Sequence, residues 1–209
     1  MIDYYTVNNS TVNICSLDLT KAFDCVNHHA LFAKLMDRNI PKCFILVLYS
    51  WYSKLYSNVR WGNSLSRLFQ LTAGVRQGGI LSPALFSIFV NEILLKLERV
   101  NKGCYLNYLC VNSITYADDL MRLVISVSEL QYLVDICVSE FRAIGMQINI
   151  SKSACIRIRD RHNVDAHSIV IDGHPLLWKR DIRYLGLSVA AGKTFTVNWQ
   201  NAKQKLLEL

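Results

Sequence analysis

Two adjacent carboxylates, Asp118 and Asp119, are the residues of this sequence best suited to chemistry. With eleven Asp among 209 residues, about 0.6 such pairs are expected by chance, so the pair alone is not specific. Its setting is unusual, because it interrupts the apolar run NSITYADDLMRLVISV. Neighbouring carboxylates in such a run repel each other and resist desolvation unless a cation offsets their charge. The run therefore predicts a tight hairpin turn that holds a metal ion.

Asp18 supplies a third carboxylate in a similar setting. It lies near the end of the strand-like segment 13–19, from which it could face the pair across neighbouring strands. Three converging acids suit two Mg²⁺ ions about 4 Å apart, which clamp the attacking and leaving oxygens of an in-line phosphoryl transfer. We expect Asp18, Asp118 and Asp119 to form a catalytic metal site for Mg²⁺, with Mn²⁺ as an alternative.

Apolar periodicity and turn residues predict the elements that position these acids. A hairpin turn is expected at Gly62-Asn63, and the glycine-rich loop 74–79 allows close approach by a ligand. The result is an α+β fold, a small and mostly antiparallel sheet with helices packed on one face. The expected strands are 13–19, 59–61, 67–71, 105–116, 120–127, 146–150, 155–158, 169–171 and 182–189, and the expected helices are 21–38, 41–55, 82–99 and 129–144.

Two of the expected helices have a predicted buried face. The face of helix 82–99 consists of Leu85, Phe86, Phe89, Ile93 and Leu97. The aromatic stripe of helix 41–55 is expected to pack in the core rather than to stack on bases; it consists of Phe44, Leu48, Trp51 and Leu55.

Composition limits the classes of protein. Hydrophobic residues make up 52% of the chain and charged residues 19%, enough for a packed core. Residues 151–209 hold ten Lys/Arg against five Asp/Glu, and the whole chain carries a net charge of +7, which favours a polyanionic partner without proving one. The longest apolar run, 43–51, is shorter than the roughly 20 residues that span a bilayer, and no secretory signal is present. Seven scattered cysteines without a C-x-x-C pair predict neither disulfides nor zinc, so we expect an intracellular protein.

Three motifs, in this order, resemble those of reverse transcriptases. Residues 18–24 (DLTKAFD) resemble the first catalytic motif, residues 74–83 (GVRQGGILSP) the second, and residues 116–119 (YADD) the third. The first two are most similar to LINE-type (non-LTR) retrotransposons, and the matches run from about residue 14 to 189. Later residues also match in order and spacing: Gly145, Asn149, Lys152 and Tyr184-Leu185-Gly186.

The resemblance implies a polymerase palm with partial fingers, and an RNA-directed DNA polymerase that extends a DNA primer on an RNA template with deoxynucleoside triphosphates. Asp18 and Asp118 would be metal ligands and Asp119 the third acid. Phe23 would lie under the incoming sugar, where its ring clashes with a 2′-hydroxyl and selects deoxynucleotides. The alternative is that Phe23 is only a core residue of the following helix.

The resemblance also implies roles for residues of the nucleotide and primer sites. Gln77 and Gly78 would sit against the template and the nascent base pair, where a side chain at Gly78 would collide. Lys152 would lie near the nucleotide phosphates as a proton donor to pyrophosphate, unless it is a solvated surface lysine. Residues 184–186 would grip the primer end, although a plain turn would look the same.

The resemblance leaves alternatives open. About a dozen residues precede the first motif and some twenty follow the last, so residues 1–209 are expected to lack most of the N-terminal fingers and the thumb. A group II intron-type or other cellular reverse transcriptase shares the YADD motif, whereas Phe23 argues against a viral RNA polymerase. A catalytically incomplete or domesticated remnant that binds nucleic acid or a partner is the alternative from another class. The expected location is the nucleus, the cytoplasm or both, and the oligomeric state is open.

Overall fold

The computed structural model describes residues 1–159 and 166–199, and the chain divides into two compact units. The first, here called the sheet unit, comprises residues 1–20 together with the chain from residue 93 onward. The second, here called the inserted unit, comprises residues 21–92. Each is described by itself.

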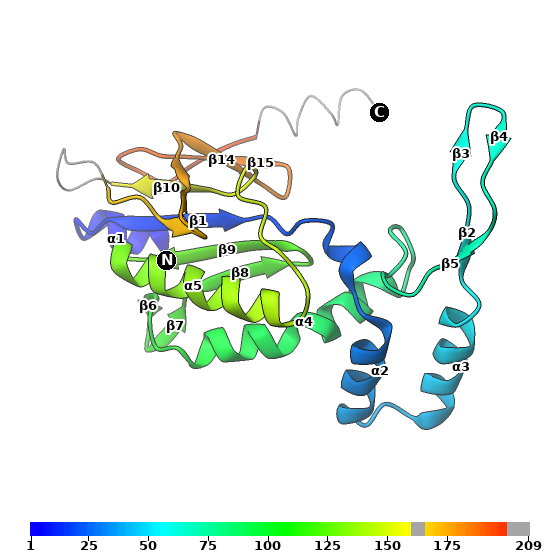
Figure 1. Cartoon of the computed structure of the whole chain (residues 1–209). Helices are drawn as coiled ribbons and strands as arrows, with labels where there is room; N and C mark the ends of the chain where they lie inside the picture. The colour runs from blue at the N-terminus through cyan, green and yellow to red at the C-terminus, as the bar shows by residue number, and fades with distance from the viewer. Residues whose placement is uncertain (160–165, 200–209) are drawn as a thin grey trace. The chain divides into compact units, whose positions relative to one another are not determined.

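The centre of the sheet unit is a five-stranded sheet with the order β13-β10-β1-β9-β8 (Figure 1). The middle strand, β1, pairs antiparallel with β9 on one side and with β10 on the other, whereas β13 is parallel to β10. The mostly antiparallel sheet expected from the sequence is therefore present. Its strands are β1 (Val12–Leu17), β8 (Ser113–Tyr116), β9 (Asp119–Val124), β10 (Ala154–Ile158) and β13 (Leu177–Trp178).

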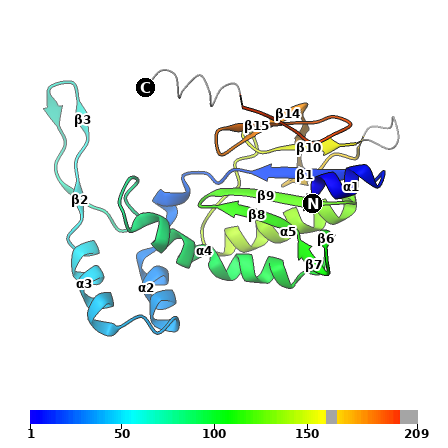
Figure 2. The ribbon, with the colours of Figure 1, turned by 180° about the vertical axis from the view of Figure 1, so that it is seen from behind.

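Both faces of this sheet are covered, because alternate side chains of each strand point to opposite faces. Helix α5 (Val127–Ala143) covers one face with a buried stripe: Leu130, Leu133, Val134, Cys137 and Phe141. On the other face, Ile14, Leu123 and Ile156 pack in one cluster with Ile182 and Val189. Those last two residues come from β14 (Asp181–Tyr184) and β15 (Leu187–Ala190), which form a second sheet with β16 (Thr196–Asn198) (Figure 2).

Helix α4 (Ser82–Arg99) confirms its prediction in length and in buried face. All five predicted core residues, Leu85, Phe86, Phe89, Ile93 and Leu97, are less than 5% exposed. Its last turns are tied to α5 by the Lys96–Glu140 ion pair, at 2.6 Å. No helix within the described residues is both long and apolar enough to cross a membrane.

The rest of the sheet unit departs from the predicted elements in two places. The single strand expected at 105–116 is divided, because Asn107 and Tyr108 have positive φ and turn the chain between β6 (Cys104–Leu106) and β7 (Leu109–Val111). The strand expected at 146–150 is reduced to one bridge, between Ile148 and Leu19. A helix, α1 (Ile2–Val7), and a hairpin of β11 (Val170–Ile171) and β12 (His174–Pro175) complete the unit.

The inserted unit begins with a helix that the sequence analysis predicted as continuous over 21–38. The structure divides it into a 3-10 turn, η1 (Ala22–Cys25), and α2 (His28–Asp37). Val26 is extended and ends the first piece, and the Asn27 side chain then caps α2 by accepting from the Ala30 amide at 3.0 Å. A short polar residue at this position therefore starts a new helix rather than continuing the old one.

Helix α3 (Lys42–Tyr52) forms as expected, but its predicted core stripe is confirmed only at Leu48, is half-buried at Leu55, and is wrong at Phe44 and Trp51. Of the residues of α3, only Leu48 and Tyr52 are buried, whereas Phe44 and Trp51 are 44% and 52% exposed. The helix is apolar on nearly every side, so periodicity could not select a face. Packing against α2 determines which face of α3 is buried, because Phe32 of α2 contacts the Tyr52 ring at a centroid distance of 6.1 Å.

After α3 the chain forms a long hairpin, here called the arm (residues 56–70). Its base is the pair β2 (Tyr56–Ser57) and β5 (Phe69–Gln70), and its outer part is the pair β3 (Arg60–Trp61) and β4 (Ser64–Leu65). The turn lies at Gly62-Asn63, which confirms the sequence prediction.

Candidate active site

The turn between β8 and β9 carries the pair of carboxylates. Tyr116 and Asp119 are paired across the two strands, so Ala117 and Asp118 form a two-residue loop. Ala117 adopts a left-handed conformation with φ of 52°, and both aspartates are partly buried. Leu120 next in the strand is buried. The predicted tight turn inside an apolar run is therefore present. It places Asp118 and Asp119 at the edge of the sheet where β8 ends and β9 begins.

Asp18 reaches the same edge from the central strand. The register of β1 with β9 pairs Leu17 with Leu120, and Asp18 follows directly on the side of Asp119. The proximity has an electrostatic consequence: burial raises the pKa of Asp119, and the negative charges of Asp118 and Asp18 raise it further. The structure therefore brings together the three acids that the sequence analysis singled out.

The chemistry of this donor set fits a hard divalent cation. Three carboxylates supply the oxygen ligands that Mg²⁺ prefers. The raised pKa of Asp119 reflects burial first and then the negative charge of Asp118 and Asp18, which a cation would offset. Among the described residues, no group of three or more His, Cys, Asp or Glu side chains is already arranged to hold a metal ion. Because like charges repel, a cation would have to draw these three side chains closer.

A turn at residues 149–153 is fastened to Asp18 through its backbone. The Asn149 amide donates to the Asp18 carbonyl at 2.7 Å, and the Asp18 amide donates to Ser153 Oγ at 3.1 Å. This places Lys152 Nζ 3.9 Å from Asp18 Oδ2. The Lys152 side chain is 68% exposed, so the ion pair adds little stability and leaves the ammonium able to move. The predicted Lys152 is thus held beside the acids.

The hairpin of β14 and β15 approaches the acids from the second sheet. Tyr184 pairs with Leu187, and the two-residue loop between them, Leu185-Gly186, has φ of 49° and 80°, as a type I′ turn requires. Burial raises the pKa of Tyr184, and the negative charge of Asp119 raises it further. The Tyr184 hydroxyl is buried and has no hydrogen-bond partner among the described residues. The predicted segment 184–186 therefore reaches the carboxylate edge.

A cavity of about 340 Å³ in the sheet unit was not predicted. Lys152 lines it together with Lys179 and Arg183, and Asp181 is the acid among its lining residues. This excess of cations favours a phosphate-bearing ligand. The basic bias of residues 151–209 was the available signal, but spacing along short strands gave no way to tell which cations share a cavity.

The remaining predicted residues belong to the inserted unit. Phe23 stacks on Phe86 of α4, with ring centroids 4.9 Å apart and planes 12° from parallel. The Phe23 carbonyl accepts from the Val75 amide at 2.7 Å. A Cβ at Gly74 would lie 3.1 Å from the Asp24 backbone, so only glycine fits there without a shift. The first motif and the glycine-rich loop are therefore in direct contact. The stacking on Phe86 supports the alternative that Phe23 is a core residue.

Gln77 and Gly78 are exposed on the glycine-rich loop. They line a cavity of about 380 Å³ together with Trp51, Leu55 and Arg76, among others. A Cβ at Gly78 would meet no atom of the described residues within 4 Å, and the φ of +78° is by itself a reason for glycine. Crowding inside the chain therefore does not explain Gly78.

Comparison with known proteins agrees with this geometry. Residues 3–189 match the family described as "Reverse transcriptase (RNA-dependent DNA polymerase)". The chain is 28% identical over 206 residues to a Retrovirus-related Pol polyprotein from type-1 retrotransposable element R2 of Popillia japonica, covering 91% of this chain and 34% of that protein. It is 29% identical over 188 residues to an RNA-directed DNA polymerase from mobile element jockey of Drosophila funebris, covering 87% of this chain and 20% of that protein.

Among solved structures, the chain is similar in fold to an apo telomerase from Candida tropicalis truncated from its C-terminal domain. The TM-score is 0.65 at 15% identity, and the match covers 92% of this chain and 38% of that one. At this identity the likeness concerns the fold. The chain spans about a third or less of the length of these relatives.

Proposed function

Because the chain belongs to the reverse transcriptase family, of the kind found in LINE-type retrotransposons, we propose that it forms the core of an RNA-directed DNA polymerase. The reaction is transfer of a deoxynucleotide to a primer 3′-hydroxyl. The single observation that carries this proposal is the convergence of Asp18, Asp118 and Asp119 at one edge of the sheet, where burial and then the charges of Asp118 and Asp18 raise the pKa of Asp119. Residues 1–209 form one catalytic domain, with a palm core at about 14–189 and partial fingers.

The three acids are proposed as the ligands of two Mg²⁺ ions, with Mn²⁺ as a substitute. When bound, these ions would activate the attacking hydroxyl and neutralise charge on the transferred phosphate. The contribution of the chain itself is to hold the carboxylates on packed strands, because Asp18 and Asp119 flank the buried residues Leu17 and Leu120.

Residues around the acids are proposed to bind the substrates. Lys152 lies 3.9 Å from Asp18 and donates a proton to the leaving pyrophosphate. Residues 184–186, whose Tyr184 hydroxyl is buried near Asp119, position the primer end. In the inserted unit, Phe23 selects the deoxyribose, and Gln77 with Gly78 contacts the template and the nascent base pair. The partners are an RNA template, a DNA primer and deoxynucleoside triphosphates, in the nucleus or the cytoplasm.

The test is primer extension on poly(rA)/oligo(dT) with Mg²⁺, comparing the chain with its Asp118→Ala variant. We expect dTTP incorporation that Asp118→Ala abolishes. Because the chain spans about a third of its relatives, the pair is compared both alone and with flanking sequence restored. Incorporation that Asp118→Ala leaves unchanged would refute the metal site, and absence of incorporation in both lengths would refute the polymerase.

A non-catalytic remnant that still binds nucleic acid is the second candidate, and one observation favours it. Arg122 is fully buried, its Nε contacts Cys137 Sγ at 3.2 Å, and both of its terminal nitrogens lack hydrogen-bond partners among the described residues. An uncompensated buried charge lowers stability, as expected of a chain no longer held to activity. Nucleic-acid binding without synthesis in both lengths would establish this candidate.

A further inference from the structure

Acidic residues are missing from a long stretch of the inserted unit. Between Asp37 and Glu92 the chain has no Asp or Glu. Six cations lie in the same stretch, and all are exposed: Arg38, Lys42, Lys54, Arg60, Arg67 and Arg76. No ion pair within the described part of the chain involves any of them. The stretch therefore presents positive charge that the described residues do not neutralise.

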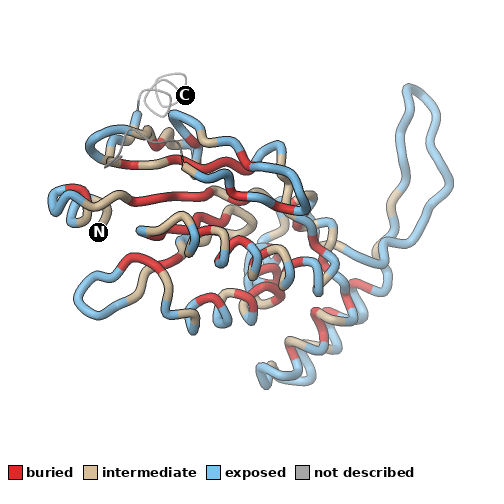
Figure 3. The backbone as a smooth tube through the Cα atoms, turned by 60° about the vertical axis from the view of Figure 1, so that its left-hand side comes forward, coloured by how far each residue is buried: buried red, intermediate tan, exposed pale blue. Residues whose placement is uncertain are grey.

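The arm belongs to this stretch, and within the inserted unit no residue buries its outer part. Every residue from Asn58 to Ala73 is exposed, as the pale blue hairpin in Figure 3 shows. Backbone bonds and one side chain hold its shape: Ser66 donates its amide to the Val59 carbonyl at 2.9 Å and accepts from the Val59 amide through Oγ at 2.8 Å. Since its side chains form no core, they are free to contact a partner.

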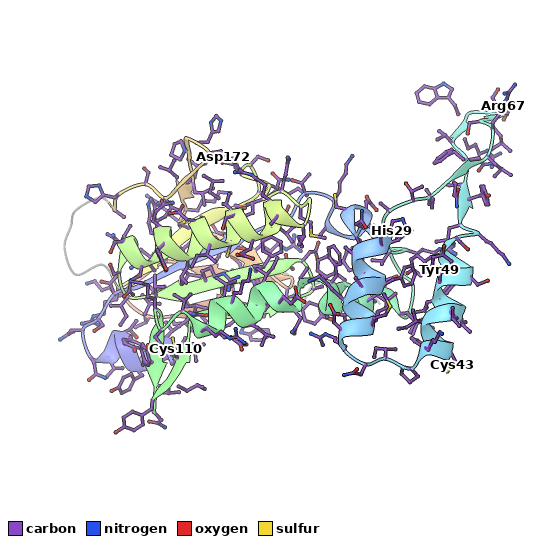
Figure 4. The ribbon with its side chains drawn as sticks, turned by 60° about the horizontal axis from the view of Figure 1, so that its bottom comes forward. His29, Cys43, Tyr49, Arg67, Cys110 and Asp172 are labelled. Carbon is purple, nitrogen blue, oxygen red and sulfur yellow. The ribbon has the colours of Figure 1, made fainter. Side chains whose placement is uncertain are left out.

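The tip of the arm combines an aromatic ring with cations. Trp61 is 84% exposed and has no ring contact with any described residue. Arg60 precedes it and donates from Nε to the Gly62 carbonyl at 3.3 Å, which holds the guanidinium at the turn. Arg67 lies on the returning side of the arm, between β4 and β5, where Figure 4 labels it. An exposed indole beside guanidinium groups is the arrangement that stacks on a base and pairs with the adjoining phosphates.

We propose that the arm is a second nucleic-acid contact, separate from the carboxylate site, that binds a single strand. Trp61 stacks on an unpaired base, and Arg60 and Arg67 pair with phosphates. An apolar protein surface would also accept Trp61 and Leu65, but it gives no reason for the absence of every acid between residues 38 and 91. The charge therefore favours the polyanion.

A second hairpin of the chain provides the matched control. Tyr108, at the turn between β6 and β7, is fully exposed, and residues 103–117 contain no charged residue. Tyr108→Ala therefore removes an exposed aromatic ring from a hairpin tip that lacks the cations.

The experiment measures the anisotropy of a labelled single-stranded oligoribonucleotide, and of the DNA oligonucleotide of the same sequence, titrated with the full chain in EDTA. We expect Trp61→Ala to weaken binding about tenfold, since stacking on one base contributes roughly 1–3 kcal/mol. Trp61→Phe should retain most of the affinity. Arg60→Ala with Arg67→Ala should lower the salt slope by about 1.4, at roughly 0.7 per phosphate contact. Tyr108→Ala should bind like the unmodified chain.

Unchanged affinity and salt slope in the Trp61 and arginine variants would overturn the proposal. So would a shift in oligomeric state on sedimentation of Trp61→Ala with unaltered nucleic-acid binding, because the arm would then dock a protein. Comparison of the RNA and DNA titrations distinguishes the two kinds of strand. Because EDTA removes metal-dependent catalysis, the titrations measure binding through the arm without any synthesis, so failure of the polymerase proposal and failure of this one are separate results.

Discussion

The carboxylate edge of the sheet unit and the arm of the inserted unit are built in opposite ways. At the edge, Asp18 and Asp119 adjoin strand residues that are no more than 1% exposed, and packing covers both faces of the sheet. In the arm, residues 58–70 are all exposed and a backbone ladder keeps the shape. The difference shows that side chains which act on a reacting group are held in position by a packed core. A surface that binds ligands of varied sequence needs only to be accessible.

The two regions also differ in the sign of their charge. The edge gathers three carboxylates, and burial with like charge raises the pKa of Asp119. The stretch that contains the arm has six cations and no acid. A nucleic-acid enzyme needs both, since metal ions bind to the first and phosphates to the second.

The largest effect should come from the edge. Asp18→Asn removes one of the three charges, and primer extension should fall about 10³-fold, as when a group that stabilises transition-state charge is lost. Asp24→Asn is the control, because Asp24 is an exposed carboxylate of the same motif. Equal losses in the two variants would contradict the special role of the sheet edge.

Arg122 is a fully buried charge in the packed sheet unit, where it is expected to lower the free energy of unfolding. Arg122→Met should raise the free energy of unfolding of the sheet unit by about 1–4 kcal/mol, because the charge is buried and two of its nitrogens have no hydrogen-bond partner among the described residues. Urea denaturation followed by circular dichroism measures this. Arg183→Met, at an exposed position, should change it by less than about 0.5 kcal/mol. A loss of stability in Arg122→Met would mean that the guanidinium is compensated.

Within the inserted unit, the joint between the first motif and the glycine-rich loop is the close contact of Gly74 with the Asp24 backbone. A substitution at this joint should lower stability more than a substitution in the arm. Gly74→Ala places a Cβ 3.1 Å from the Asp24 backbone at φ of +93°, so it should cost about 1–3 kcal/mol. Gly62→Ala, in the arm at φ of +58° with no atom within 4 Å, should cost about 1 kcal/mol. Hydrogen exchange of α2 amides reports both. Similar losses would show that the joint is no tighter than the arm.

The smallest effect concerns alkaline pH. Burial raises the pKa of the Cys104 thiol to about 12, and the charge of Cys110 adds to the shift. An unfolded thiol titrates near about 8.5, so the stabilising contribution of Cys104 is complete below that pH and is lost as pH rises toward 12.

Thermal unfolding between neutral and alkaline pH tests this contribution. Cys104→Ala should flatten the alkaline fall in stability, whereas Cys43→Ala, at an exposed position, should leave it unchanged. An identical fall in both variants would show that the buried thiol does not contribute.

Local patterns were sufficient for the elements that have one strong signal. The apolar period and the Ser82-Pro83 start predicted α4 with its full buried face, and the turns at 62–63 and 117–118 lie where glycine or adjacent acids marked them. The stripe of α3 was predicted wrongly in part, because a helix apolar on nearly all sides gives no direction until α2 contacts it through Phe32. The roles of Phe23 and of Gln77 stay predictions.

The sequence by itself determined the family and the order of the three acids, because motif residues are read along the chain and need no distances. Only the tertiary structure decided which side chains share a space. It placed Tyr184 near enough to Asp119 for that charge to add to the rise in the Tyr184 pKa that burial causes. It also fastened the turn that carries Lys152 to Asp18 through the Asn149 amide, and it left the arm exposed among the described residues. The reason is that strand register and packing join residues more than a hundred positions apart, and no local pattern encodes that pairing.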